Sequence, residues 1–461
     1  MARSRKRTRK PSLYVGVDVG GTKVMAAVVT PGGDILGSHR TPTPRDAKPK
    51  KTVAAILEAI ANALDEQKVA PDELGGIGLT IPGVVDPDTG TIVVTPNMNL
   101  TGVVIVPVVE ERFGVPVAIG NDVNMGTLGE KWLGAARRAQ SAVCVMVGTG
   151  IGGGVIMNGK LVRGSREAAG EVGHMIVEIG GPQCGCGNCG CWEALASRTA
   201  IERDIRQAVA AGKDTVATRL VEKSDGLFKS SVLRKALKAG DKVVTRIVRR
   251  ASEVLGYGCL TIRHLLDPEV IILGGGVIEA CGRWVLPVVR EIVGADALPG
   301  ARPGCYIAES ELGDDAVVLG AVALAMEARG EDPMKVKLPV PDYPTIESTE
   351  FGQIVIGGKT YRTDVRIGAD GKARKRKKER VKERLGTSHK IDANELDKAC
   401  QGHPDVLIIG TGQQGAAVLT ADGEEYLKAR RLGFKTLPTP EAAAAYNRAK
   451  GRRAAIFHLT C

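Results

Sequence analysis

Short apolar runs and helical stretches alternate along most of the chain. The strand-like runs are rich in aliphatic residues and end at glycine, proline or a polar residue; they cover residues 13–18, 23–30, 34–40, 77–81, 117–119, 141–147 and 270–273. The helical stretches cover residues 51–67, 122–133, 241–266 and 313–329. This alternation predicts an α/β fold. Strand, glycine-rich turn and strand follow one another twice, which hints at an internal duplication.

The length and the local composition indicate several domains. A chain of 461 residues is long enough for two or three. We expect a disordered basic arm at residues 1–12 and a linker at residues 330–345, which hold four prolines. Residues 346–461 have strand and turn signals of their own and are enough for a separate small α/β domain.

The net charge of +11 is concentrated in two segments. Residues 1–10 carry six Lys/Arg and no acid, and residues 372–384 carry nine Lys/Arg against two Glu, so removing both leaves about −2. A nearly neutral body with 3% aromatic residues does not favour a nucleic-acid-binding groove. Only these two segments are candidates for contact with nucleic acid or an acidic partner. The alternative for each is an ordinary solvated surface.

No segment is long and apolar enough to span a membrane, and the N-terminus lacks the apolar region of a signal peptide. We therefore expect a cytoplasmic protein without membrane contact. In a reducing compartment the ten cysteines would be thiols or metal ligands rather than disulfides.

Three glycine-rich loops follow strand-like runs and are candidates for phosphate binding. Glycines let backbone N–H groups turn toward an anion, and an aspartate at the mouth of such a loop can hold Mg²⁺ directly or through water. The loop residues are Asp18, Gly20, Gly21, Thr22 and Lys23 in the first, Gly148, Thr149 and Gly150 in the second, and Gly274, Gly275 and Gly276 in the third. An ordinary hairpin turn is the alternative for the first loop taken alone.

Asn121 and Asp122 follow a strand at a position where α/β proteins expose functional groups. Phosphoryl transfer to a hydroxyl needs a carboxylate that accepts the proton, and Asp122 can serve. The alternative is a helix cap without chemistry.

A cluster of potential zinc ligands lies between Glu171 and Glu193. His174, Cys184, Cys186, Cys189 and Cys191 are five candidates for the four places of a structural zinc site. Free thiols are the alternative. A closed zinc site here would fix the two carboxylates and the imidazole as groups that bind hydroxyls.

Taken together, these strings resemble the ROK family of sugar kinases and repressors. The match runs in order from about Leu13 to Arg329, and its most specific part is the His–Cys–Cys–Cys–Glu string that ends at Glu193. The resemblance implies a two-lobed actin/hexokinase-like (RNase H-like) ATPase fold. We expect the N-terminal lobe at residues 13–120, with the helix 313–329 returning to it, and the C-terminal lobe with the zinc site at residues 121–312.

The resemblance also implies roles for single residues. Asp122 would be the general base, and the zinc ligands would be His174, Cys184, Cys186 and Cys191, because Cys189 stands where the family has another residue. Sugar would be bound by Gly83, Asn97, Asn121, Asp122, Glu171, His174 and Glu193. The first two glycine loops would hold phosphate and the third the adenosine side of ATP.

The last segment resembles a different family, the small Mth-like domain shared with a mitochondrial complex I assembly factor. The resemblance rests on Phe351, Tyr361, Asp364 and Val365, on the string at residues 409–415, and on the ending at residues 458–461. The glycines at residues 410–415 also satisfy the dinucleotide fingerprint, but residues 416–420 have a strand pattern where that site requires a helix.

We therefore expect a glucokinase-like enzyme that uses ATP and Mg²⁺ to convert glucose to glucose 6-phosphate, with a structural zinc ion and as a homodimer. Another hexose, an N-acylmannosamine or a polyphosphate donor are alternatives. A non-catalytic sugar sensor or repressor is a further one, although the twelve residues ahead of Leu13 are too few for a helix-turn-helix domain.

Overall fold

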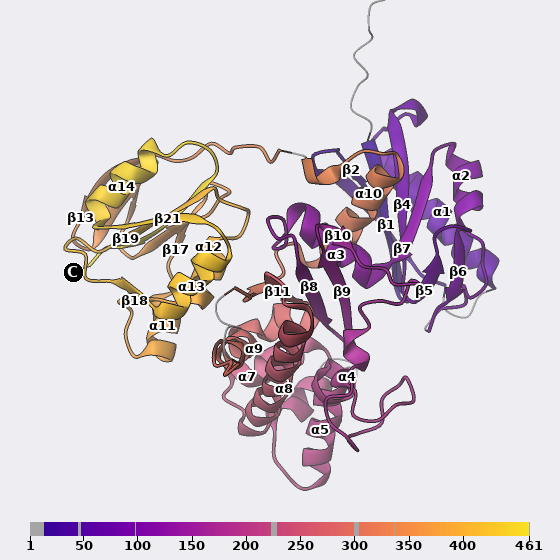
Figure 1. Cartoon of the computed structure of the whole chain (residues 1–461), viewed down its shortest axis with the longest axis horizontal. Helices are drawn as coiled ribbons and strands as arrows, with labels where there is room; N and C mark the ends of the chain where they lie inside the picture. Colours follow the sequence, from indigo (N-terminus) through magenta and orange to yellow (C-terminus); the bar gives the residue numbers. More distant parts are fainter. Residues whose placement is uncertain are drawn as a thin grey trace, which may run out of the picture. The chain divides into compact units, whose positions relative to one another are not determined.

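The computed structural model describes residues 13–44, 48–96, 98–222, 228–298, 304–335 and 337–460 (Figure 1). The basic arm expected at residues 1–12 and the candidate sugar contact Asn97 lie outside these residues. The chain divides into two compact units. The first contains Met1–Arg137, Gly152–Val172 and Leu312–Leu338, and the second contains Arg138–Ile151, Gly173–Glu311 and Pro339–Cys461.

The first unit is built on a five-stranded sheet. In order across the sheet its strands are β3 (Ile35–Pro42), β2 (Lys23–Val29), β1 (Leu13–Val19), β4 (Leu74–Ile81) and β7 (Val117–Asn121). β1 runs antiparallel to β2 and parallel to β4, and β4 runs parallel to β7. The carboxyl ends of β1, β4 and β7 therefore meet at one edge, where α/β sheets carry their functional groups.

Both faces of this sheet are covered by helices, as the alternation of side chains along a strand requires. Val15 and Val17 of β1 pack in one core with Ile56 of α1 (Pro49–Glu66). Tyr14, on the opposite face, packs in a second core with α3 (Asp122–Leu133) and α10 (Ala316–Ala328). α3 and α10 approach so closely that a Cβ on Gly320 would lie 1.7 Å from the Met125 carbonyl oxygen. Glycine is required at that crossing.

Shorter elements complete the first unit, and the sequence pattern did not reveal most of them. They are β5 (Val84–Asp86), β6 (Thr91–Val94), α2 (Val106–Phe113), β9 (Ile151–Met157) and β10 (Lys160–Leu161). β5 pairs with β6, and β9 pairs with β10, each as an antiparallel hairpin.

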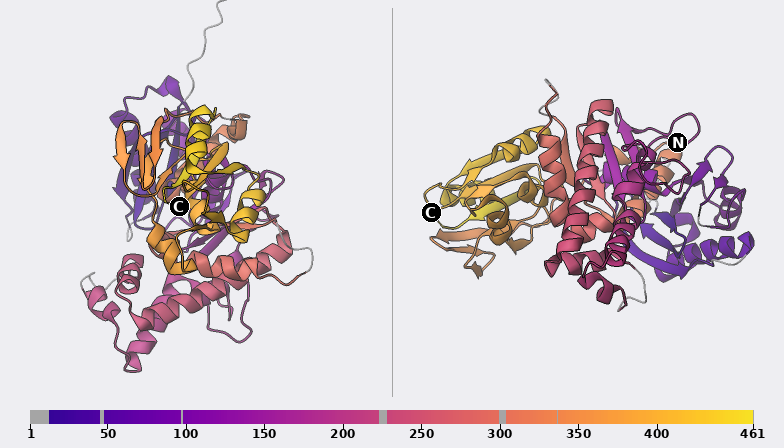
Figure 2. Two further views of the ribbon diagram at one scale, coloured as in Figure 1. Left: turned by 90° about the vertical axis from the view of Figure 1, so that its left-hand side faces the viewer. Right: turned by 90° about the horizontal axis from the view of Figure 1, so that it is seen from below.

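The second unit begins with three parallel strands, in the order β8 (Ala142–Val147), β11 (Val270–Gly274) and β12 (Tyr306–Glu309). Its helices are α4 (Trp192–Ala196), α5 (Arg198–Ala210), α6 (Val216–Glu222), α7 (Ser230–Lys238), α8 (Lys242–Leu266) and α9 (Gly276–Gly294). The long helices α8 and α9 lie side by side (Figure 2). Trp192 is fully buried against Gly258 of α8, and its indole N–H donates to the Val254 carbonyl at 3.0 Å.

The C-terminal segment has its own sheet and its own core. Its strands are β13 (Ile346–Glu350), β14 (Gln353–Ile356), β15 (Lys359–Tyr361), β16 (Val365–Ile367), β17 (Ala373–Lys375), β18 (Lys390–Ile391), β19 (Val406–Thr411), β20 (Val418–Leu419), β21 (Gly433–Leu437) and β22 (Arg453–His458). Its helices are α11 (Lys378–Leu385), α12 (Ala393–Ala399), α13 (Ala421–Ala429) and α14 (Thr439–Arg448). The main sheet has the order β17-β16-β22-β19-β21, and Ile408, Tyr446 and Phe457 lie in its core.

Candidate active site

Two carboxylates of the first unit lie at the edge where its parallel strands end. Asp18 is near the end of β1, and Asp122 is the first residue of α3, directly after β7. Both side chains are partly exposed. Burial, followed by the charge of Asp122, raises the pKa of Asp18 to about 6. Burial also raises the pKa of Asp122, and the charge of Glu171 adds to the effect. Neighbouring carboxylates that resist ionisation are typical of functional sites.

Asn121 caps the helix that carries Asp122. Its side-chain oxygen accepts hydrogen bonds from the backbone N–H groups of Val123 at 2.9 Å and Asn124 at 3.1 Å. Its amide nitrogen donates to the Gly83 carbonyl at 2.9 Å. Gly83 has a φ of 115°, and a Cβ there would lie 2.1 Å from the Val94 carbonyl oxygen. The cap that the sequence offered as an alternative is therefore present, and it fixes the backbone from which the Asp122 carboxylate projects.

The first glycine loop is a tight hairpin turn between β1 and β2. The Gly20 N–H donates to the Lys23 carbonyl at 2.9 Å, and the Thr43 hydroxyl donates to the Gly20 carbonyl at 2.6 Å. Thr22 and Lys23 are exposed at its tip, and Gly21 is half-buried. The Thr80 hydroxyl donates to Asp18 at 3.5 Å, so β4 supplies a partner that sequence analysis missed.

The second and third glycine loops lie together in the second unit. Gly148 donates its N–H to the Gly150 carbonyl at 2.9 Å, which closes the turn after β8. Gly275, with a φ of 82°, lies close to the end of β8: a Cβ there would be 2.8 Å from the Val147 carbonyl oxygen. Gly276 then begins α9, whose N-terminal N–H groups form a favourable environment for an anion.

Arg198 is a second candidate that sequence analysis missed. Its guanidinium donates to the Thr149 hydroxyl at 2.5 Å, and its backbone N–H donates to the Gly148 carbonyl at 2.9 Å. The Thr199 hydroxyl donates to the Thr149 carbonyl at 2.8 Å. A cation thus lies directly beside the glycine loop, where a phosphate would gain a charge-assisted hydrogen bond.

Glu193 joins the second glycine loop to the cysteine cluster. One carboxylate oxygen accepts from the Ile151 N–H at 2.9 Å, and the other lies 3.5 Å from the Cys184 sulfur. Gly150 leaves room for this carboxylate, because a Cβ there would lie 2.1 Å from its oxygen. Glu193 is therefore held on both sides in the second unit, whereas Glu171 is exposed in the first.

The four ligands that the family resemblance implied are brought together. The candidate ligand atoms of His174, Cys184, Cys186 and Cys191 all lie within 4.8 Å of one another, and Cys189 does not belong to the group. Cys184 Sγ lies 3.7 Å from His174 Nδ1, and Cys186 Sγ lies 3.7 Å from Cys191 Sγ. Ligands about 2.3 Å from a tetrahedral Zn²⁺ are about 3.7 Å apart, so this donor set fits zinc.

Comparison with known proteins identifies both parts of the chain. The ROK family model matches residues 14–328, and a protein family of unknown function, DUF498/DUF598, matches residues 346–458. The chain belongs to the ROK family. The second match confirms the expected fusion to an Mth-like domain.

Two relatives show the range of the family. A glucokinase from Halalkalibacterium halodurans is 33% identical over 67% of this chain and 93% of its own length. The DNA-binding transcriptional dual regulator NagC from Escherichia coli is 30% identical over 68% of this chain and 75% of its own length.

A solved structure confirms the expected fold class. The ROK family glucokinase from Streptomyces griseus, in complex with glucose and AMPPNP, is 32% identical, with a TM-score of 0.59. The similarity covers 68% of this chain and 100% of that one. Among the described residues, none of the helices has the length and apolar character to cross a membrane.

Proposed function

We propose that the chain is an ATP-dependent sugar kinase, with glucose as the first substrate to test. The observation that carries the proposal is the pair of carboxylates with raised pKa values, Asp18 and Asp122, at the ends of parallel strands in a ROK protein. A glucokinase of this family has been crystallised with glucose and an ATP analogue. The proposed products are glucose 6-phosphate and ADP.

In the proposed reaction Asp122 accepts the proton of the sugar 6-hydroxyl, which then attacks the terminal phosphate in line. Asn121 would orient the sugar through the amide hydrogen that its bond to Gly83 leaves available. Gly83, Asn97, Glu171, His174 and Glu193 are the other proposed sugar contacts. Partial burial of Asp122 keeps its basicity above that of a free carboxylate, which favours proton transfer.

The glycine loops and Arg198 would hold the phosphate chain of the nucleotide. Backbone N–H groups of Thr149 and Gly150, the N-terminus of α9 and the Arg198 guanidinium are donors suited to the charge that develops on the phosphate. Asp18 is the proposed residue that holds Mg²⁺, which would neutralise phosphate charge when bound.

Zinc would have a structural role in this proposal. His174, Cys184, Cys186 and Cys191 fill all four places of a tetrahedral site, which leaves no position for a reacting water. The ion would stabilise the cysteine segment that leads into α4, from which Glu193 approaches Ile151, and so would fix the proposed sugar contacts.

A second candidate is a sugar-responsive regulator, because one relative is the regulator NagC. A coupled assay of ADP release across glucose, mannose, fructose and an N-acylmannosamine tests both. Asp122→Asn should abolish turnover and leave glucose binding largely intact. Asp88→Asn, an exposed carboxylate of the same unit, is the control and should behave as wild type. Sugar binding without turnover in zinc-loaded wild-type protein would favour the regulator.

A further inference from the structure

The basic residues at 372–384 line one wall of a groove in the second unit. The groove has a volume of about 530 Å³. Side chains of α7 and α9 form one wall, and side chains of β16, β17, α11 and α12 form the other. It therefore lies where the Mth-like domain meets helices of the ROK part. None of the residues proposed for the active site lines it.

Positive charge dominates this groove. Twelve Lys or Arg residues line it, against three Glu. Glu309 pairs with Lys398, and Glu395 pairs with Arg376. Among the described residues, six of the lining cations take part in no ion pair; they are Arg234, Lys238, Arg366, Lys375, Lys377 and Arg380. The positive charge of these six side chains is therefore available to a bound anion.

These cations come close enough to repel one another. The charge of Arg380, followed by burial and the charge of Arg366, lowers the pKa of Lys377. Burial, followed by the charge of Arg374, lowers the pKa of Arg366. A like-charge cluster raises the free energy of the folded protein, and a bound anion would reverse that contribution.

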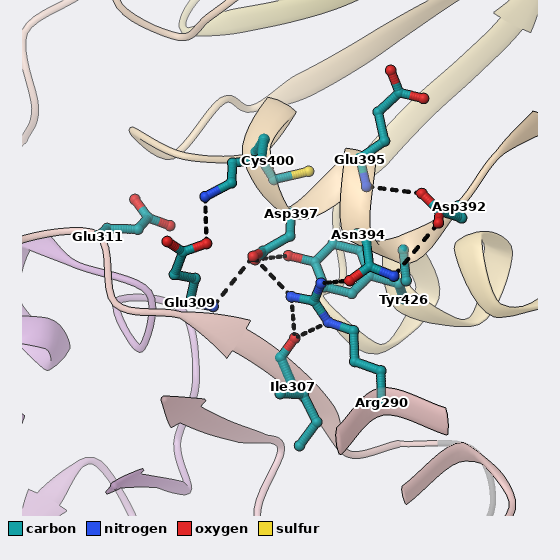
Figure 3. A network of polar contacts seen from close by, with 12 residues as sticks. Arg290, Ile307, Glu309, Glu311, Asp392, Asn394, Glu395, Asp397, Cys400 and Tyr426 are labelled. Carbon is teal, nitrogen blue, oxygen red and sulfur yellow. Dashed lines mark hydrogen bonds and ion pairs between the residues drawn. The ribbon is translucent and has the colours of Figure 1, made fainter. Parts of the chain in front are cut away.

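The groove is also held in shape before any ligand arrives. Arg290 of α9 lines it and is fixed by the Ile307 carbonyl, by Asn394 and by Asp397 (Figure 3). Arg376 is almost fully buried and is fixed by Asp364 and Glu395. The Arg290–Asp397 pair joins the two walls and the Arg376 pairs fix the second wall, so the unpaired cations are presented at little conformational cost.

We propose that this groove binds a linear oligophosphate, a chain of two or more phosphate groups that is either free or part of a nucleotide. Arg and Lys in such density match closely spaced phosphate charges. A volume of about 530 Å³ is that of a small-molecule site. This inference does not rest on the proposed kinase function.

Trp284 distinguishes the two sources of the phosphate chain. It lines the groove and is half-buried, and the Arg283 guanidinium lies 4.5 Å from its ring centre. The other two tryptophans, Trp132 and Trp192, are fully buried. A nucleotide base that stacks on the indole would quench its fluorescence, whereas inorganic tripolyphosphate offers no ring.

The test is calorimetric and fluorescence titration of the full-length protein with tripolyphosphate, ADP and a DNA duplex. Lys375→Ala/Lys377→Ala should weaken tripolyphosphate binding by about a hundredfold, at about tenfold for each cation. Lys435→Ala/Lys450→Ala removes two exposed lysines of the same domain that do not line the groove and should change nothing. Hexose kinase activity should be equal in both variants and in wild type.

Each outcome bears on the proposal. Equal affinity for tripolyphosphate and ADP supports an inorganic chain, whereas tighter ADP binding that Trp284→Ala weakens supports a nucleotide. ADP binding at the proposed active site would persist in Lys375→Ala/Lys377→Ala. Only the part of the ADP binding that this variant loses is therefore assigned to the groove. No saturable tripolyphosphate binding, equal losses in both double variants, or tighter binding of the duplex would overturn the proposal.

Discussion

Replacing Arg290 with methionine tests whether the buried network fixes the Mth-like domain to the ROK part. The Arg290 guanidinium donates to Asp397 at 2.8 Å and to the Ile307 carbonyl at 2.9 Å, and it also contacts Asn394 (Figure 3). Methionine keeps most of the apolar length of the side chain and removes the charge. Asp397 would then be a buried carboxylate without its cation.

The expected loss follows from the burial of the two partners. The side chains of Arg290 and Asp397 are 11% and 2% exposed. Removing one partner of such a pair costs about 3–5 kcal/mol. Asp397 would still accept from the Tyr426 hydroxyl at 2.9 Å and from the Glu309 N–H at 3.2 Å. We therefore expect the lower end, about 3 kcal/mol, because these bonds continue to stabilise the carboxylate.

Urea unfolding followed by Trp284 fluorescence measures this change, because Trp284 lies on the same helix as Arg290. Limited proteolysis within residues 330–345 reports undocking of the domain. Arg249→Met is the control: its pair with Glu253 is exposed and should contribute less than about 1 kcal/mol. The double variant Arg290→Met/Asp397→Asn should be no less stable than Arg290→Met alone. Strictly additive losses, or an Arg290→Met protein as stable as the control, would refute the reasoning.

Three further predictions concern the candidate active site. Asp18 must be ionised to hold Mg²⁺, so kcat/KM should fall as the pH drops through about 6; a limb near the ordinary pKa of about 4 would contradict this. Cys184→Ser should lose zinc in metal analysis and weaken sugar affinity, and wild-type protein free of zinc would exclude the site. Arg198→Met should raise the KM for ATP about tenfold without changing the KM for sugar, whereas Arg206→Met on the same helix should change neither.

The sequence predicted the sheet of the first unit well, because most of its strands are rich in aliphatic residues and lie between clear turns. β1, β2, β3, β4 and β7 all occur where the pattern placed them, within a few residues. It missed α9, which begins at Gly276 and contains Gly282 and Pro287. These residues disfavour an isolated helix, so burial against α8 and α7 decides its conformation. The expected lobe boundary at residue 120 stays a prediction, although α3 packs on α10 in the first unit.

The motifs together with the family resemblance predicted the members of the candidate site but not how they are held. Motif spacing alone left five candidates for the four zinc ligands, and the resemblance was needed to leave out Cys189. Arg198 could not be predicted, because nothing in its sequence environment distinguishes it from Arg203 or Arg206 on the same helix. Only the turn of the chain after Ser197 brings its guanidinium to Thr149. The groove could not be predicted either. The charge of residues 372–384 is evident in the sequence, but the other wall of the groove is formed by α7 and α9, which lie far away in the sequence.

The stability of the groove variant separates a binding role from a structural one. Six cations that line the groove have no ion pair among the described residues, and three of them, Lys375, Lys377 and Arg380, come from the basic segment 372–384. Removing Lys375 and Lys377 should therefore relieve repulsion and raise the urea midpoint slightly in the absence of ligand. Saturating tripolyphosphate should stabilise the wild-type protein more than the variant and so reverse their order. If the variant is less stable than wild type without ligand, these lysines stabilise the fold. The proposal that their unpaired charge serves to bind an anion would then be contradicted.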